Sequence, residues 1–340
     1  MASTVGTIMA LLVFLTFLSL ITNQYVPVWM KDSESGHMGE ALGQMGNFKS
    51  YIDIQILTAQ QAVWAQQHYI PVTTFSTVKL GVDGVPIFSS PTVGQLVVDQ
   101  TQAPWTVWFR YSISGNNTMV PEATCSCGGN VVLTVFNRYY PMQSIAYENG
   151  ALIRSQADGQ VVKAPPSFQV SVPPAAQNAT VAIDYVLIQL FGSGGVSGVG
   201  AEGLLGRAIG VDLQSYTNIN TAIWVNSSTQ HGAAWYYFFN NTLAGAYSAY
   251  YKGTDYNTRS GFVYAEAFDA GGKVRQLKVD NPIFFLQTLW NTAKSWYDVT
   301  LEFKTPGVRN GVTVPAISPF RLQHAFVNVA AGERGNTVGI

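Results

Sequence analysis

Hydrophobic and polar positions change their period twice along this chain of 340 residues. Residues 5–21 are almost wholly apolar, which predicts a hydrophobic helix. Residues 28–57 carry apolar side chains at helical spacing, which predicts an amphipathic helix. From about residue 72 the period falls to two, as in β-strands. We therefore expect a hydrophobic and amphipathic N-terminal helix over 1–62 and a β-rich head over 63–340.

The apolar run predicts a membrane anchor once its uncharged flanks are counted. About 20 apolar residues cross a bilayer, and no charged residue precedes Lys31. Tyr25 and Trp29 suit the membrane interface. A cleaved secretory signal is the rival interpretation, but it needs a basic segment before the apolar run, and none is present. Lys31 alone would place the head inside, whereas glycosylation motifs in the head favour the outside, and we give them more weight.

The helical stretch after residue 27 carries two neighbouring stripes, one apolar and one of glycine. Pro27 itself predicts a kink or a new helix start. The apolar stripe comprises Met38, Leu42, Met45, Ile52 and Ile56. The glycine stripe comprises Gly36, Gly39, Gly43 and Gly46. Small residues at this spacing let helices approach closely. Two interpretations stay open: the helix lies on its own head, or it packs against the same helix of neighbouring subunits.

The sequence of the head predicts many short strands joined by turns. Residues 129–162 predict an antiparallel meander, because Asn149-Gly150 and Asp158-Gly159 are strong hairpin turns. Residues 192–203 are rich in glycine and predict an internal linker, a possible boundary between two β domains. Residues 235–243 fit a short helix or a strand. Strands at this density predict an antiparallel β-sandwich or jelly-roll-like head.

Composition agrees with the expectation, drawn mostly from the anchor, that the head lies outside the cell. Charged residues make up 11% of the chain and the formal net charge is −1, so no basic face for nucleic acid is expected. Asn-x-Ser/Thr motifs mark candidate N-glycosylation sites. These sites are Asn116, Asn178, Asn226 and Asn240.

The sequence carries no constellation typical of catalysis. Gly198, Gly200 and Gly203 match a G-x-G-x-x-G pattern, but neither a long following helix nor an acidic residue about 20 positions later accompanies them. Cys125 and Cys127 predict a tight local disulfide outside the cell, with free thiols or an intersubunit bridge as alternatives. Two cysteines make half a structural zinc site at most. We expect no enzyme activity, no cofactor and no metal site.

Three segments resemble a known family. Residues 3–8 (STVGTI), which lead into the apolar run, resemble the N-terminal helix of archaeal type IV pilin-like proteins. Residues 79–90 and 137–156, above all 147–151 (YENGA), look like strand motifs of uncharacterised archaeal surface proteins with such a helix. The resemblance implies apolar helices that form a filament core or a membrane anchor, with β heads displayed outside. Prepilins carry basic residues before the leader cleavage site, and none precedes the apolar run here.

Two functions follow as expectations. The first is a structural cell-surface protein, a pilin-like subunit or an anchored pseudopilin, whose partners are membrane lipid or identical subunits. The second is a membrane-tethered adhesin or ligand-binding module, in which tyrosines of the second half contact a carbohydrate or a peptide, including surface glycans. Those tyrosines are Tyr247, Tyr250, Tyr251 and Tyr256.

Overall fold

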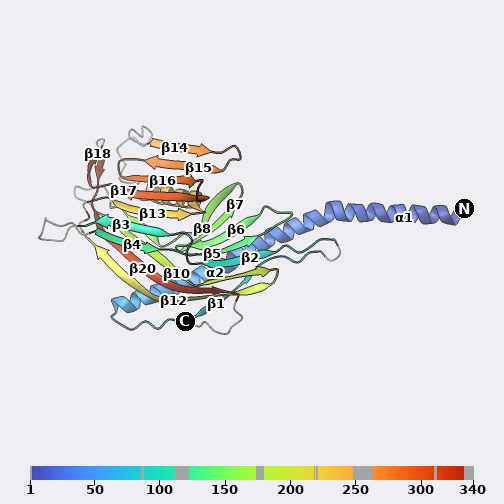
Figure 1. Cartoon of the computed structure of the whole chain (residues 1–340), viewed down its shortest axis with the longest axis horizontal. Helices are drawn as coiled ribbons and strands as arrows, with labels where there is room; N and C mark the ends of the chain where they lie inside the picture. The colour runs from blue at the N-terminus through green and yellow to red at the C-terminus, as the bar shows by residue number, and fades with distance from the viewer. Residues whose placement is uncertain are drawn as a thin grey trace.

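The computed structural model describes residues 2–85, 88–111, 122–173, 180–217, 219, 221–247, 263–309 and 312–332. A long N-terminal helix precedes a head built mainly from β-sheets, and in Figure 1 the first part of this helix projects away from the head. The predicted fold class, mainly β with a long N-terminal helix, is confirmed. The sequence predicted this division because the apolar period changes where the helix gives way to strands.

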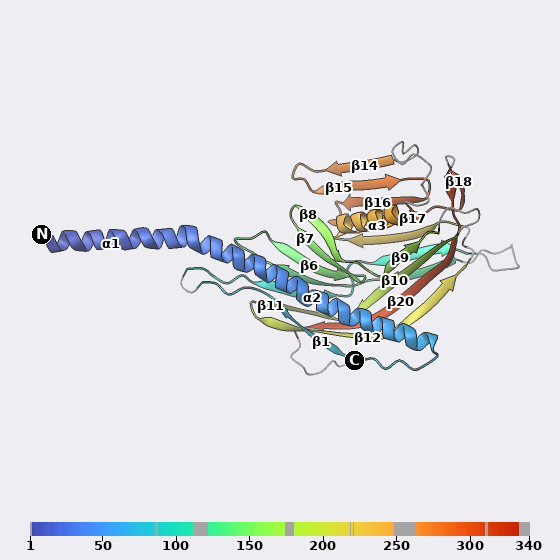
Figure 2. The ribbon, with the colours of Figure 1, turned by 180° about the vertical axis from the view of Figure 1, so that it is seen from behind.

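The helix runs without a break through the predicted kink. α1 (Ala2–Leu20) continues as a π-helical turn η1 (Ile21–Tyr25) into α2 (Val26–Trp64). Pro27 lies in the first turn of α2 and has no N–H to donate to the preceding turn. The chain widens just before it, where the Val26 N–H bonds the Ile21 carbonyl five residues back. Proline therefore changes the direction of the rod, visible in Figure 2, without ending it.

A five-stranded sheet forms the middle of the head. Its strands, in spatial order, are β1 (Thr74–Lys79), β12 (Ala201–Tyr216), β20 (Ile317–Ala331), β10 (Val181–Phe191) and β9 (Phe168–Ser171). The sheet is mixed, since β10 and β20 run parallel, whereas the sequence predicted antiparallel pairing. α2 lies across β12 so closely that a Cβ on Gly206 would stand 2.6 Å from Cδ1 of Ile52. A side chain at position 206 would therefore force Ile52 and Phe48 to move away from β12.

A six-stranded antiparallel sheet contains the predicted meander. Its order is β11 (Ser193–Gly198), β2 (Gly94–Asp99), β5 (Asn130–Val135), β6 (Gln143–Glu148), β7 (Ala151–Gln156) and β8 (Gly159–Ala164). β5 to β8 pair in chain order, as the turn signals predicted. Asn149 and Gly150 both have positive φ, 44° and 77°, as the hairpin turn requires.

The predicted linker at 192–203 is instead strand β11 and the turn into β12. Glycine occurs in this segment for a steric reason, because the chain passes close to the backbone of β20. A Cβ on Gly192 would lie 1.9 Å from the Val329 carbonyl oxygen, and φ at Gly192 is +122°. The G-x-G-x-x-G pattern thus belongs to the turn that carries the chain from β11 of one sheet to β12 of another, and a strand follows it instead of a helix.

A seven-stranded antiparallel sheet and one helix complete the head. The sheet order is β14 (Val263–Phe268), β15 (Val274–Asp280), β16 (Phe284–Asn291), β17 (Trp296–Phe303), β13 (Ile223–Thr229), β3 (Trp105–Arg110) and β4 (Glu122–Cys127). Residues 235–243, open between helix and strand in the sequence, belong to helix α3 (Gly232–Tyr247). A small ribbon pairs β18 (Gly307–Arg309) with β19 (Val312–Val314).

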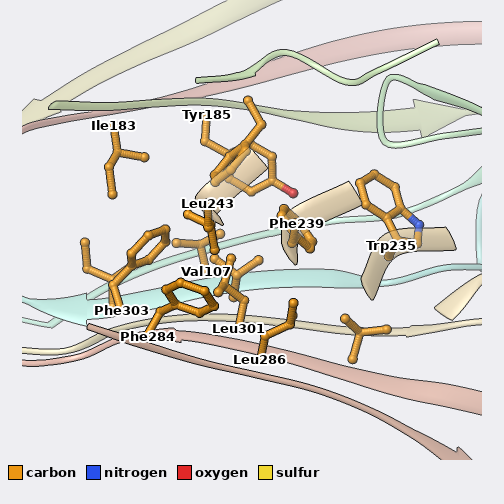
Figure 3. Packing of buried hydrophobic residues seen from close by; sticks show 14 of the residues in the cluster. Val107, Ile183, Tyr185, Trp235, Phe239, Leu243, Phe284, Leu286, Leu301 and Phe303 are labelled. Carbon is orange, nitrogen blue, oxygen red and sulfur yellow. The ribbon is translucent and has the colours of Figure 1, made fainter. Parts of the chain in front are cut away.

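Two hydrophobic cores meet at β10. The first lies between the seven-stranded sheet, α3 and one face of β10, and Figure 3 shows Phe239 and Leu243 of α3 between Tyr185 and the sheet residues Leu286 and Leu301. The second contains the inward face of α2 with parts of the five- and six-stranded sheets. Alternate side chains of β10 point into each core, so this strand is buried on both faces and ties the two halves together.

Candidate assembly surface and the contacts that position it

α1 presents apolar side chains to its surroundings on every side. Phe17, Phe14 and Ile8 are each more than 60% exposed, and none of the most apolar 18-residue window is buried. A soluble monomer rarely exposes an apolar surface of this size. By length and composition the helix can cross a membrane, although a signal sequence passes the same test. α1 is therefore the surface of this molecule that most needs a partner, either lipid or protein.

The predicted apolar stripe of α2 packs against the chain's own head. Met38, Met45 and Ile52 are buried, and Leu42 is half-buried beside them. The ring of Phe48 on this face meets the ring of Tyr147 on β6 edge to face, with centroids 5.4 Å apart. For these side chains the structure shows the first of the two open interpretations, a helix lying on its own head. They are not available for packing between subunits.

The glycine stripe lies beside the apolar stripe and turns mostly toward solvent. Gly36, Gly39 and Gly43 are exposed and Gly46 is half-buried. A Cβ built on any of them would meet nothing within 4 Å in the described part of the chain. No contact within the described part of the subunit therefore explains why glycine stands at these positions. The stripe remains open to a partner helix.

A buried acid fastens α2 to the head. Glu34 is fully buried, and its carboxylate accepts hydrogen bonds from the consecutive backbone N–H groups of Arg138, Tyr139 and Tyr140, at 3.0, 2.8 and 2.7 Å. The Thr92 hydroxyl donates another, at 2.5 Å. Successive backbone N–H groups in a turn form a natural anion site. Sequence analysis missed this contact, although Glu34 stands at the helical position that continues the apolar stripe upstream of Met38.

His37 lies one turn further along the same interface. Its Nε2 donates to the Lys79 carbonyl at 2.9 Å, and its Nδ1 is buried without a hydrogen-bond partner in the described residues. Burial lowers the pKa of His37 from its usual 6.5, and the bond to the carbonyl only partly opposes this. The docked helix therefore favours the neutral imidazole.

The His37 pKa predicts a loss of stability in acid. Because the folded pKa lies below the unfolded one, the unfolded chain takes up the proton first as the pH falls through 6.5, and stability present at neutral pH is lost. We expect His37→Gln to melt with a smaller drop in Tm between about pH 7 and pH 5 than the wild type. Exposed His68, replaced in the same way, is the control and should leave the drop unchanged. Equal drops in all three proteins would contradict the assignment.

A second buried acid joins the sheets at the motif that carried the resemblance. Glu148 is fully buried at the end of β6. It accepts hydrogen bonds from the Thr229 hydroxyl (2.8 Å), from His231 Nδ1 (2.9 Å) and from Trp235 Nε1 (2.7 Å). These donors lie at the end of β13 and the start of α3, so one carboxylate connects the six-stranded sheet to the α3 layer.

Asn149, the next residue, extends this junction to the middle sheet. Its amide nitrogen donates to the Tyr185 hydroxyl at 2.8 Å, and its carbonyl oxygen accepts the Ile188 N–H at 2.9 Å. Both partners belong to β10. The 147–151 segment is thus a structural junction of three layers, buried away from solvent, and not an exposed recognition loop.

Both cysteines are free thiols in the structure, so the predicted disulfide is not formed. Cys125 and Cys127 stand two positions apart on β4 and share a face. Such residues lie about 6.6 Å apart along a strand, whereas a disulfide needs Cβ atoms roughly 4 Å apart. Burial raises the pKa of both thiols, that of Cys125 to about 11, with the Asp212 carboxylate contributing there.

The predicted glycosylation and tyrosine sites are only partly described. Asn226 lies half-buried on β13, between β3 and β17, and Asn240 lies half-buried in α3, so neither occupies a loop. Tyr247 is buried in the core. The remaining predicted sites lie outside the described residues: Asn116, Asn178, Tyr250, Tyr251 and Tyr256.

Two tryptophans lie on the outer face of the seven-stranded sheet, on the neighbouring strands β3 and β13. Trp108 and Trp224 stack on each other there, with ring centroids 3.9 Å apart and planes 8° apart. Each ring therefore covers one face of the other, as in a cross-strand pair that stabilises the sheet. The stack accounts for both tryptophans without a ligand.

Comparison of the chain with protein-family models, with curated proteins and with solved structures finds no match.

Proposed function

We propose that this chain is a structural protein of the cell surface, a pilin-like subunit or an anchored pseudopilin, with no enzymatic role. One observation carries the proposal: α1 exposes apolar side chains on all sides, and the head leaves its most apolar window uncovered. Burial of such surface stabilises by about 25 cal/mol per Å² removed from water. Lipid or identical helices would supply that burial, and the head would be displayed outside.

The docking of α2 supports a structural role. If a long helix were attached to its head through one flexible joint, the head could move independently of the helix. Here α2 is fixed along much of its length, by Glu34 near one end and by Met38, Met45 and Ile52 beyond it. The head therefore follows the helix as one unit, which is what an assembled or anchored surface protein requires.

Filaments are the first thing to look for in native material. Cells are sheared, the released fraction is viewed by negative-stain electron microscopy, and mass spectrometry identifies the chain and its N-terminus. Filaments containing the chain would establish a pilin-like subunit. Recovery in the membrane pellet without filaments would establish an anchored head. Recovery as a soluble protein that lacks α1 would overturn the proposal.

Substitution in the glycine stripe tests self-association, because it should preserve folding while it weakens assembly. We expect the double variant Gly39→Leu, Gly43→Leu to fold at least as stably as the wild type, because each change relieves roughly 0.5–1 kcal/mol of helix cost and each Cβ meets open space. Association, measured by light scattering or crosslinking, should weaken because the leucines keep partner helices apart.

The matched control for the stripe is Thr58→Leu, on an exposed position of α2 well beyond the last glycine of the stripe. It adds a side chain of the same size and should leave association unchanged. Wild-type association by the glycine variant would exclude the stripe as a contact between subunits and leave lipid as the partner of the rod.

A further inference from the structure

A cleft between two sheets gathers a thiol, an imidazole and a carboxylate. It lies between edge strand β4 and the face of β12 and β20 that turns away from α2, and its volume is about 310 Å³. This is the small end of the range for ligand pockets. Strand β4 contributes Thr124, Cys125 and Ser126 to its lining, β12 contributes Asp212, and β20 contributes His324.

The polar groups of the cleft stand in fixed positions. Asp212 and His324 are directly paired across the β12–β20 ladder, which places their side chains side by side. The Gln214 amide donates to one Asp212 oxygen at 2.9 Å and accepts a hydrogen bond from the Tyr216 hydroxyl, so its orientation is held from both ends. Nε2 of His324 is shut off from solvent and has no partner in the described residues.

Only one formal charge lines the cleft at neutral pH. The pKa of Cys125 is raised to about 11 by burial and by Asp212, so the thiol stays protonated. The pKa of His324 is lowered by burial, against the pull of Asp212, so the imidazole stays neutral. Asp212 is therefore a carboxylate among neutral thiol, imidazole, amide and hydroxyl groups. A protonated thiol is a weak nucleophile, which argues for binding and against covalent catalysis.

We propose that this cleft binds a small organic ammonium ligand, with the Asp212 carboxylate as its counter-ion and the neighbouring Gln214 side chain as a hydrogen-bond partner. A carboxylate and an ammonium form a charge-assisted hydrogen bond. The free oxygen of Asp212 and the amide oxygen of Gln214 both accept hydrogen bonds, and an ammonium group offers three donors. The proposal is independent of the assembly role of α1.

Cys125 provides a reporter inside the cleft itself. It is half-buried, whereas Cys127 is 5% exposed, so a small reagent such as iodoacetamide reaches Cys125 first. The full-length protein in detergent is alkylated with and without D-glucosamine, and D-glucose is the neutral probe of matched size. With glucosamine at about four times its Kd, mass action leaves roughly one fifth of the clefts empty, so alkylation of Cys125 should slow about fivefold. D-glucose should have no effect.

A matched pair of variants assigns the protection to the carboxylate. In Asp212→Asn the protection by glucosamine should be lost, and alkylation without ligand should be faster because the charge that raises the thiol pKa has gone. Asp158→Asn, in the exposed β7–β8 turn, should retain the fivefold protection, since Asn-Gly suits that turn as well as Asp-Gly. Equal protection by both sugars, no protection by glucosamine, or protection that survives Asp212→Asn would each overturn the proposal. The sugar comparison tests the unaltered chain and needs no variant to fold.

Discussion

Replacing Glu148 by alanine is expected to lower the free energy of unfolding by about 3–5 kcal/mol, the cost of breaking a buried charged network. The change leaves the Thr229 hydroxyl, His231 Nδ1 and Trp235 Nε1 without the acceptor that now binds all of them. These donors are buried, so water cannot replace the carboxylate without disturbing the core. Denaturant unfolding of the full chain in detergent, followed by tryptophan fluorescence, measures the loss.

The control for this prediction is another glutamate in a strand. Glu122 on β4 is half-exposed and its distance to Arg110 is 3.8 Å. Surface pairs of this kind contribute about 0–1 kcal/mol, so Glu122→Ala should unfold almost as the wild type does. A wild-type midpoint for Glu148→Ala would mean that the junction of β6, β13 and α3 does not depend on this carboxylate.

Replacing Glu34 by alanine should loosen the stalk from the head. The backbone N–H groups of 138–140 and the Thr92 hydroxyl would lose their acceptor. Each buried group left unpaired costs about 1–3 kcal/mol, so a total of roughly 3 kcal/mol or more is expected. Because Glu34 lies near the start of the docked part of α2, hydrogen exchange should rise first in the early turns of α2 and in the 137–141 turn, and less in the seven-stranded sheet.

An exposed acid on the same helix provides the comparison. Glu40 bonds only Gln44, one turn away, at 3.0 Å. Pairs at this spacing contribute about 0.2–0.5 kcal/mol, so Glu40→Ala should leave both exchange and unfolding near wild-type values. If Glu34→Ala exchanges like the wild type, the carboxylate does not fasten the helix, and the apolar contacts of Met38 and Ile52 hold it alone.

The helix and the meander were predictable because their signals are local. An uninterrupted apolar run and a stripe at helical spacing need no knowledge of the rest of the fold. Asn149-Gly150 and Asp158-Gly159 define hairpins whose strands are neighbours in the chain. The prediction of a linker at residues 192–203 was wrong because a glycine-rich segment can arise for two reasons. Glycine is common in flexible segments, but Gly192 is glycine because the chain passes close to the backbone of Val329, and the sequence alone does not reveal this contact.

The buried acids and the cleft were invisible in the sequence because their partners are remote. Glu34 binds groups 58 to 106 positions away, and Glu148 binds groups 81 to 87 positions away. A glutamate in a helix or a strand is ordinarily solvent-exposed, so no local pattern separates these two from the rest. Cys125, Asp212 and His324 likewise come together only where β4 meets the β12–β20 ladder.

The sequence by itself determined the apolar rod, the amphipathic stripe of α2 and the β character of the head, because hydrophobic period and turn chemistry are properties of neighbouring residues. Only the tertiary structure decided which partner the stripe of α2 takes, that β10 and β20 run parallel between two cores, and that the glycines of α2 face outward. Those outcomes depend on long-range pairing and on which groups share a low-dielectric interior, where a carboxylate such as Glu34 is stable only if donors from distant segments surround it.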